Sequence, residues 1–145
     1  MNRSTLTIDY TETSKNNLGP EDIELLEQAV KAAESAYAPY SQFRVGAAVR
    51  LDNGQVLCGN NQENASFPAG ICAERSVVFY AHANFPANRI LTIAITASPC
   101  GVCRQVLLES EKRGGVPIRV LLAAGEQVLI FKSVKDLLPF GFDSF

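Results

Sequence analysis

The sequence has no tryptophan, one histidine, one methionine and four cysteines among its 145 residues. Its charges are interspersed and sum to −2, and no block of lysine and arginine could follow a phosphate backbone, so we expect no nucleic-acid partner. It has no run of about 18 apolar residues, and no positively charged segment followed by an apolar core near residue 1. We therefore expect a cytoplasmic protein that does not enter membranes.

The apolar content is sufficient for one hydrophobic core. Hydrophobic residues make up 47% of the chain, which at this length is typical of a single domain that needs no disulfides. We place that domain at residues 1–145. Residues 1–18 are polar and show no sustained period, and we expect them to form a flexible arm or an edge strand.

Hydrophobic periodicity and turn residues predict alternating helices and strands. The expected elements are a helix from 20 to just before Pro39, strands over 43–51 and 55–59, a helix from 71 or 72 to 83, a strand over 89–97, a helix over 100–112, strands over 118–124 and 127–131, and a short helix over 133–138. The buried face of the first helix is predicted to contain Ile23, Leu26, Val30, Ala33 and Tyr37. A hairpin followed by β-α-β units indicates an α/β fold, a three-layer α/β/α sandwich with a mixed five-stranded sheet.

Three of the four cysteines lie in two short motifs, Cys72-Ala73-Glu74-Arg75 and Pro99-Cys100-Gly101-Val102-Cys103. Three thiolates without a fourth cysteine or histidine nearby in the sequence are typical of an open zinc site, which keeps one position for water. A C-x-x-C pair near a glutamate also suits a reducing compartment. We therefore expect one zinc ion per chain in preference to two disulfides.

Residues next to the cysteines can adjust the charge of such a site. Both motifs are expected at helix N-termini, where unpaired N–H groups stabilise thiolates. Three thiolates leave the zinc site with net negative charge, which Arg75 and Arg104 could offset through hydrogen bonds to sulfur, with Gln105 as a further donor. For either arginine, the alternative is a solvated surface charge.

Glu74 is the predicted catalytic residue, because it lies two residues after Cys72 and would face the water of an open zinc site. Such a carboxylate can take a proton from water and pass it to the reacting molecule. The alternative is an acidic residue that only favours a helix N-terminus. Outside the motifs, we expect Cys58 to be a small buried hydrophobe and His82 to have a structural or surface role.

Five motifs occur in an order that resembles a known family over residues 37–142. They are Tyr37-Ala38-Pro39-Tyr40-Ser41-Gln42-Phe43-Arg44-Val45-Gly46-Ala47-Ala48, Asn61-Gln62-Glu63-Asn64-Ala65, Cys72-Ala73-Glu74-Arg75, Pro99-Cys100-Gly101-Val102-Cys103-Arg104-Gln105 and Leu137-Leu138-Pro139. The chain thus resembles the small, homotetrameric zinc cytidine deaminases of the cytidine and deoxycytidylate deaminase family, whose zinc signature is a known one. The resemblance implies Cys72, Cys100 and Cys103 as zinc ligands and Glu74 as proton carrier.

The resemblance also implies how a nucleoside would bind. Asn61 and Glu63 would hold the ribose hydroxyls, Ala65 would contact the base through its backbone, and Phe43 would pack on the nucleoside. Family members share active sites between subunits, and a phenylalanine after Leu-Leu-Pro enters the neighbouring pocket. Here that residue would be Phe142, or else Phe140.

The alternative for this tail is that its aromatic residues, which are Phe140, Phe142 and Phe145, close the protein's own core. A departure from the family lies at Ala97, which runs directly into Ser98 where relatives have a loop of several residues. Either a deletion alters the wall of the pocket, or a mobile loop is absent from the sequence, and we favour the second. An intact mass of 15.7 kDa would exclude the missing loop.

The reaction implied is hydrolytic deamination of cytidine and 2′-deoxycytidine to uridine and 2′-deoxyuridine with release of ammonia, in pyrimidine salvage. Water would attack C4 of the ring while Glu74 protonates N3 and then the leaving amine. One alternative substrate is a cytosine-containing nucleoside antibiotic. A second alternative is a non-catalytic zinc-stabilised module, for which Glu74 would have no use. Editing of RNA or DNA is a third, disfavoured because the sequence has no basic stripe.

Overall fold

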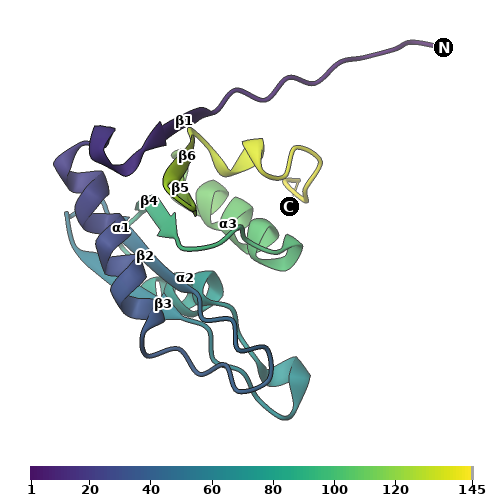
Figure 1. Ribbon diagram of the computed structural model, residues 1–145. Helices are drawn as coiled ribbons and strands as arrows, with labels where there is room; N and C mark the ends of the chain where they lie inside the picture. The colour runs from purple at the N-terminus through teal and green to yellow at the C-terminus, as the bar shows by residue number, and fades with distance from the viewer. Residues whose placement is uncertain (145) are drawn as a thin grey trace.

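A mixed six-stranded sheet lies between two layers of helices in the computed structural model, which describes residues 1–144 (Figure 1). The strands are β1 Thr11–Ser14, β2 Gly46–Leu51, β3 Val56–Asn60, β4 Ile90–Ile95, β5 Arg119–Ala124 and β6 Gln127–Phe131. The α-helices are α1 Pro20–Ala33, α2 Ala73–Asn84 and α3 Gly101–Gly114, and the 3-10 helices are η1 Lys15–Asn17, η2 Phe67–Ala69 and η3 Val134–Asp136. The predicted three-layer α/β/α architecture is confirmed. Phe145 lies outside the described residues.

The sheet has the strand order β1-β6-β5-β4-β2-β3, in which β4 and β5 pair in parallel and the other neighbours pair antiparallel. The predicted count of five strands was one too few, because β1 adds an edge strand to β6, with Thr11 opposite Ile130. Strand β1 has the sequence Thr-Glu-Thr-Ser, without an apolar side chain to reveal it. The edge strand expected within residues 1–18 therefore occupies 11–14, while residues 1–10 form an exposed arm without helix or strand.

Helix α1 is shorter than expected and ends at Ala33, six residues before Pro39. Its buried residues are Leu25, Leu26 and Ala29. Val30 and Tyr37, both predicted on the buried face, are 46% and 54% exposed, so that prediction was wrong at these positions. At Val30 the predicted apolar stripe was one residue too far along, since Ala29 is the buried residue, and Tyr37 lies beyond the end of α1. The last predicted helix is also shorter and is the 3-10 turn η3.

The helices cover opposite faces of the sheet (Figure 1). Helix α1 packs on one face, and α2 and α3 pack on the other. Two glycines allow a close approach to the β2–β3 hairpin: a Cβ on Gly46 would collide with the carbonyl oxygen of Ala29, and one on Gly59 would lie 2.8 Å from the backbone nitrogen of Val77. Both helices beside the hairpin therefore rest directly on its backbone.

Five residues, 96–100, connect the end of β4 to the start of α3. Thr96 joins Gly46 through two hydrogen bonds, one from its backbone N–H to the Gly46 carbonyl and one from the Gly46 N–H to its Oγ1, both 3.0 Å. The join noted at Ala97 and Ser98 is therefore long enough to turn the chain from strand into helix. Among residues 1–144, no helix combines the length and apolar character needed to cross a bilayer.

Candidate active site

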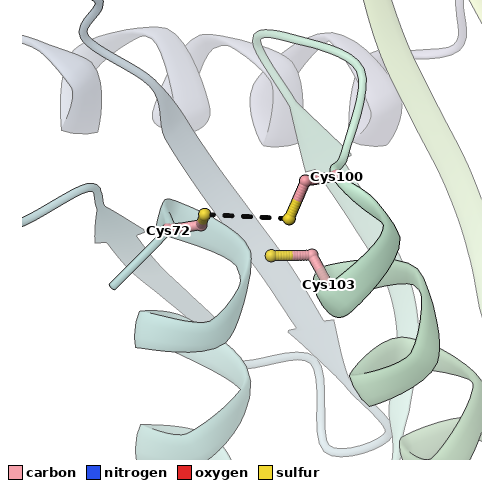
Figure 2. A group of neighbouring side chains, drawn as sticks. All are labelled: Cys72, Cys100 and Cys103. Atoms are coloured by element: carbon pink, nitrogen blue, oxygen red, sulfur yellow. Dashed lines mark hydrogen bonds between the residues drawn. The ribbon is translucent and has the colours of Figure 1, made fainter. Parts of the chain in front are cut away.

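The three motif cysteines meet where α2 and α3 begin (Figure 2). Cys72 is the N-cap of α2, Cys100 is the N-cap of α3, and Cys103 lies in the first turn of α3. Their Sγ atoms all lie within 4.8 Å of one another, and those of Cys72 and Cys100 are 4.0 Å apart. Two helix N-termini thus bring together sulfurs that are 28 residues apart in the chain.

The donor set of this cluster fits zinc. A tetrahedral ion with Zn–S bonds of about 2.3 Å places its sulfurs about 3.8 Å apart, close to the observed separation. Burial opposes ionisation of Cys100, but hydrogen bonds from the cluster and from the backbone of α3 lower its pKa overall. Burial and the negative charges of Glu74 and Cys72 raise the pKa of Cys103. Three sulfurs this close can all be thiolates only beside a cation, as in a metal site.

Glu74 lies beside the sulfur cluster and is 4% exposed. Burial raises the pKa of its carboxyl group, and its own backbone N–H, the charge of Arg75 and the thiol of Cys103 offset part of that rise. A carboxyl group in the first turn of α2 would ordinarily be solvated. Its enclosure next to the cysteines indicates a role at this site rather than one in capping the helix.

Arg75 is the arginine that contacts a thiol of the cluster. Its Nη2 donates to Cys72 Sγ at 3.6 Å, while its Nε is buried without a hydrogen-bond partner among the described residues. A guanidinium in this position places positive charge against the thiolates, which weakens their donation to the metal. Of the two arginines considered from the sequence, Arg75 is therefore the one in position to offset the thiolate charge.

Arg104 contacts backbone and a serine rather than sulfur. Its Nε donates to the Pro99 carbonyl and its Nη1 to the Leu137 carbonyl, both at 2.9 Å, and its Nη2 donates to Ser98 Oγ at 3.2 Å. These bonds fix the short connection before α3 to the segment after η3. The structure therefore separates the two arginines: Arg75 contacts the cluster, and Arg104 holds the chain around it.

Gln105 contacts the C-terminal tail, not the cysteines. Its Nε2 donates to the Phe142 carbonyl and its Oε1 accepts from the Phe142 N–H, both at 2.9 Å. Gly141 packs against Leu108, where a Cβ would lie 2.6 Å from the leucine side chain. The backbone of the tail is thus fixed on α3, yet the side chains of Phe140 and Phe142 are 92% and 79% exposed. Neither phenyl ring closes the core of its own chain.

Asn61 and Glu63 organise the loop that precedes β2. Asn61 Oδ1 accepts from the Val45 N–H and its Nδ2 donates to the Phe43 carbonyl, both at 2.8 Å. Glu63 Oε1 accepts from the N–H groups of residues 40 and 41, at 2.9 and 3.1 Å. Hydrogen bonds from Ser41 lower the pKa of Glu63, so this carboxyl group is held as an ionised acceptor. Neither of these hydrogen-bonding contacts to the loop before β2 could be read from the sequence.

Phe43 and Ala65 lie on exposed parts of the loops that the hydrogen bonds of Asn61 and Glu63 organise. The Phe43 side chain is 62% exposed, and its N–H donates to Ser41 Oγ at 3.1 Å. Between Ser41 and Phe43, Gln42 has a φ of 56°, a left-handed conformation that is uncommon for a residue other than glycine. Ser41 was given no role from the sequence, although a serine two residues before the aromatic ring is a turn signal that could have indicated one.

The remaining cysteine and the histidine lie away from this cluster. Cys58 is exposed on β3, so the expectation that it would be buried was wrong. His82 Nε2 lies 2.8 Å from Ser110 Oγ, which links α2 to α3. Burial and the charge of Arg113 lower the pKa of His82. The histidine therefore has a structural contact, as expected.

Comparison with known proteins identifies the class to which this fold and site belong. The family described as the cytidine and deoxycytidylate deaminase zinc-binding region matches residues 20–116. A cytidine deaminase of Mycobacterium tuberculosis is 40% identical over 128 residues, which cover 79% of this chain and 86% of the relative. One from Halalkalibacterium halodurans is 43% identical over 91 residues, covering 59% and 68%. The chain therefore belongs to the cytidine and deoxycytidylate deaminase family.

A solved structure supports the same conclusion. The cytidine deaminase of Burkholderia pseudomallei superposes with a TM-score of 0.70 at 39% identity, covering 83% of this chain and 98% of that one. Together with the geometry of the cluster, family membership makes Cys72, Cys100 and Cys103 the zinc-binding triad. The chain has the zinc site of a hydrolase, which was expected from the C-x-E and P-C-x-x-C motifs.

Proposed function

We propose that this protein catalyses the hydrolytic deamination of cytidine, and also of 2′-deoxycytidine, in pyrimidine salvage. Water and the nucleoside give uridine or 2′-deoxyuridine and ammonia. The observation that carries the proposal is the buried carboxyl group of Glu74, enclosed beside three cysteine sulfurs. A zinc ion bound by the cysteines supplies a Lewis acid that makes water a better nucleophile at neutral pH.

Glu74 moves the protons of this reaction. Its carboxylate accepts a proton from the attacking water and delivers it to N3 of the ring as C4 is attacked. A second proton, from the hydroxyl group formed at C4, passes through the same carboxyl group to the amino group. The bond between C4 and that nitrogen then breaks, so that ammonia leaves and C4 becomes a carbonyl. Enclosure of Glu74 supports this role, because a proton carrier must be close to the reacting atoms and shielded from bulk water. Arg75 compensates the charge of the thiolates without taking part in proton transfer.

The nucleoside is held by the loops before β2 and before α2. Asn61 and Glu63 serve the ribose hydroxyls, and Glu63 is suited to this because hydrogen bonds from Ser41 and from the Tyr40 N–H lower its pKa and hold it ionised. Phe43 packs against the nucleoside, and Ala65 contacts the base through its backbone. Selection of a nucleoside over a free base follows from the ribose contacts, since an unpaired polar group in the site disfavours a ligand that lacks its partner.

Assembly into a homotetramer with shared active sites completes the proposal. Phe140 and Phe142 project from a tail whose backbone is fixed to α3, which is an arrangement suited to reaching a neighbouring subunit. We assign Phe142 to the neighbouring pocket. A zinc site made of three thiolates suits a reducing compartment, and the cytoplasm is the compartment we propose.

The ultraviolet absorbance of cytidine tests the function directly. We expect the band of the amino-pyrimidine to decline with the zinc-loaded protein, and to persist with a chelated sample and with Glu74→Gln. Replacement by glutamine keeps the shape of the side chain, so zinc content and melting temperature should be those of the parent protein. An unchanged band with the zinc-loaded parent would overturn the proposal, as would turnover by Glu74→Gln at the parent rate.

A further inference from the structure

Residues 34–45, which connect α1 to β2, lie beside the connection between β3 and α2 (Figure 1). The two connections are joined by hydrogen bonds from the Tyr37 N–H to the Asn61 carbonyl at 3.0 Å and from the Glu63 N–H to the Tyr37 carbonyl at 2.8 Å. Phe43, which we assign to nucleoside packing, follows in the first of them. The direction of its ring therefore depends on the backbone of one short segment, residues 40–43.

Each of the four consecutive N–H groups of residues 40–43 has an acceptor. Glu63 Oε1 accepts from the first two, at 2.9 and 3.1 Å, and the Ala38 carbonyl accepts from the third at 2.9 Å. The fourth N–H, that of Phe43, donates to Ser41 Oγ at 3.1 Å. The segment is thus held by hydrogen bonds although it belongs to no helix or strand, and the last of these bonds depends on one serine side chain.

The hydroxyl group of Ser41 has a partner on each side. A hydroxyl group has one proton to donate and can also accept. That of Ser41 accepts from the Phe43 N–H and donates to Glu63, whose pKa it lowers more than any other contact does. Because Ser41 is exposed, its side chain contributes these hydrogen bonds and no burial. The carboxylate of Glu63 is therefore connected to the backbone of Phe43 through a single side chain.

Gln42, between the two residues that this bond joins, has the left-handed φ of 56°. A residue with a Cβ adopts this conformation at a cost that glycine does not have. The hydrogen bond from the Phe43 N–H to Ser41 Oγ spans Gln42 and opposes its return to a negative φ. Without that bond, the backbone of Gln42 can relax and turn the ring of Phe43 away from its place.

We propose that Ser41 is a positioning residue that holds the Phe43 ring at a fixed place relative to Glu63. The inference rests on the proposed function, in which Phe43 and Glu63 both contact the nucleoside. Asn61 Nδ2 fixes the backbone of Phe43 at its carbonyl, at 2.8 Å, and Ser41 fixes it at its N–H. A ring that is fixed before the substrate arrives loses less conformational entropy on binding.

The mobility of the ring tests this role without turnover. The chain has no tryptophan, so Phe43→Trp gives a single fluorescent side chain at this position. In that protein, Ser41→Ala should increase the amplitude of nanosecond depolarisation about twofold, measured by time-resolved fluorescence anisotropy. Ser41→Thr keeps the hydroxyl group and should not. Ser35→Ala is the matched control, because the Ser35 hydroxyl also accepts one hydrogen bond and donates one, from Asn60 at 3.1 Å and to Ala32 at 3.4 Å.

Steady-state kinetics distinguish positioning from direct contact with the substrate. Ser41→Ala should raise KM for cytidine about fivefold and change kcat by less than about twofold. In Phe43→Ala, where there is no ring to hold, the same change should raise KM by less than about twofold. Zinc content and melting temperature confirm that each variant is folded.

An equal rise of KM in both backgrounds would show that Ser41 contacts the substrate itself, and would overturn the positioning role. Unchanged depolarisation in Ser41→Ala, an equal increase in Ser35→Ala, or no rescue by Ser41→Thr would overturn it too. If the parent protein leaves cytidine intact, the proposed function fails, while the depolarisation still decides whether Ser41 fixes the ring.

Discussion

Gln105 and Phe142 are joined by two hydrogen bonds of 2.9 Å that run in opposite directions between one amide side chain and one backbone. The pair fixes the backbone of the tail while the phenyl ring of Phe142 stays 79% exposed. An anchored backbone with a free aromatic side chain loses little entropy when the ring enters a neighbouring site. The pair is therefore a direct route to testing whether active sites are shared.

Phe142→Ala should raise KM for cytidine by about tenfold, because the ring that we assign to the neighbouring subunit's pocket is lost. Gln105→Leu should raise KM in the same direction by releasing the tail, and Phe140→Ala is the control with a similarly exposed ring. Steady-state kinetics give these values. Mixing Phe142→Ala with Glu74→Gln subunits after reversible dissociation should restore turnover at low cytidine concentration, since some sites then combine an intact Glu74 with an intact Phe142. Absence of recovery in verified mixed oligomers would contradict the sharing of sites.

Removal of one zinc ligand should abolish metal binding, and removal of the remaining cysteine should not. Cys103→Ser replaces a buried thiolate of the cluster, so we expect zinc per chain to fall below about a tenth and the melting temperature to fall with it. Cys58→Ser is the matched control, because Cys58 is exposed on β3. Metal analysis and thermal melts give both values. Full zinc content in Cys103→Ser would contradict the triad.

If Glu63 binds the ribose as we propose, Glu63→Ala should raise KM for cytidine by about tenfold or more, because that charged acceptor is lost. The same change also frees the N–H groups of Tyr40 and Ser41, so a second variant is needed to separate the roles. Glu63→Gln keeps an oxygen for those N–H groups and removes the charge. Full recovery of KM in Glu63→Gln would assign Glu63 to the loop alone. Turnover of 1-methylcytosine, which has no ribose, should respond less to either variant.

Acid should destabilise the fold in part through His82. Burial and Arg113 hold its pKa below the usual 6.5, so the unfolded chain binds the proton more readily than the folded chain. The stability associated with neutral His82 is present above pH 6.5 and declines as the pH falls through the lower, folded pKa. His82→Gln should lose less stability between pH 7.5 and 5.5, measured as midpoints of urea unfolding with zinc content verified. Parallel curves for the two proteins would contradict this prediction.

The positions of the zinc ligands were predictable because they depend on local spacing. Cys100 and Cys103 lie within one helical turn, and the same motifs that specify them also begin their helices. The role of Arg104 was not predictable, since its partner Leu137 lies 33 residues away and becomes its neighbour only after the tail folds onto α3. Strand β1 was expected only as one alternative for residues 1–18 and its bounds could not be predicted, because a four-residue edge strand needs no apolar side of its own when β6 supplies its hydrogen bonds.

Gly59 connects the strength of the metal site to the packing of the sheet. Because Gly59 has no side chain, α2 can rest on β3 near Ala73 and Val77. This contact lies in the first turns of the helix, whose N-cap is Cys72. A methyl group there would push this helix outward and move one sulfur away from the other two. Substitutions that add side-chain volume between β3 and α2 would therefore be detected first as weaker zinc affinity, before any loss of folded protein. Selection for tight metal binding would by itself keep a glycine at position 59.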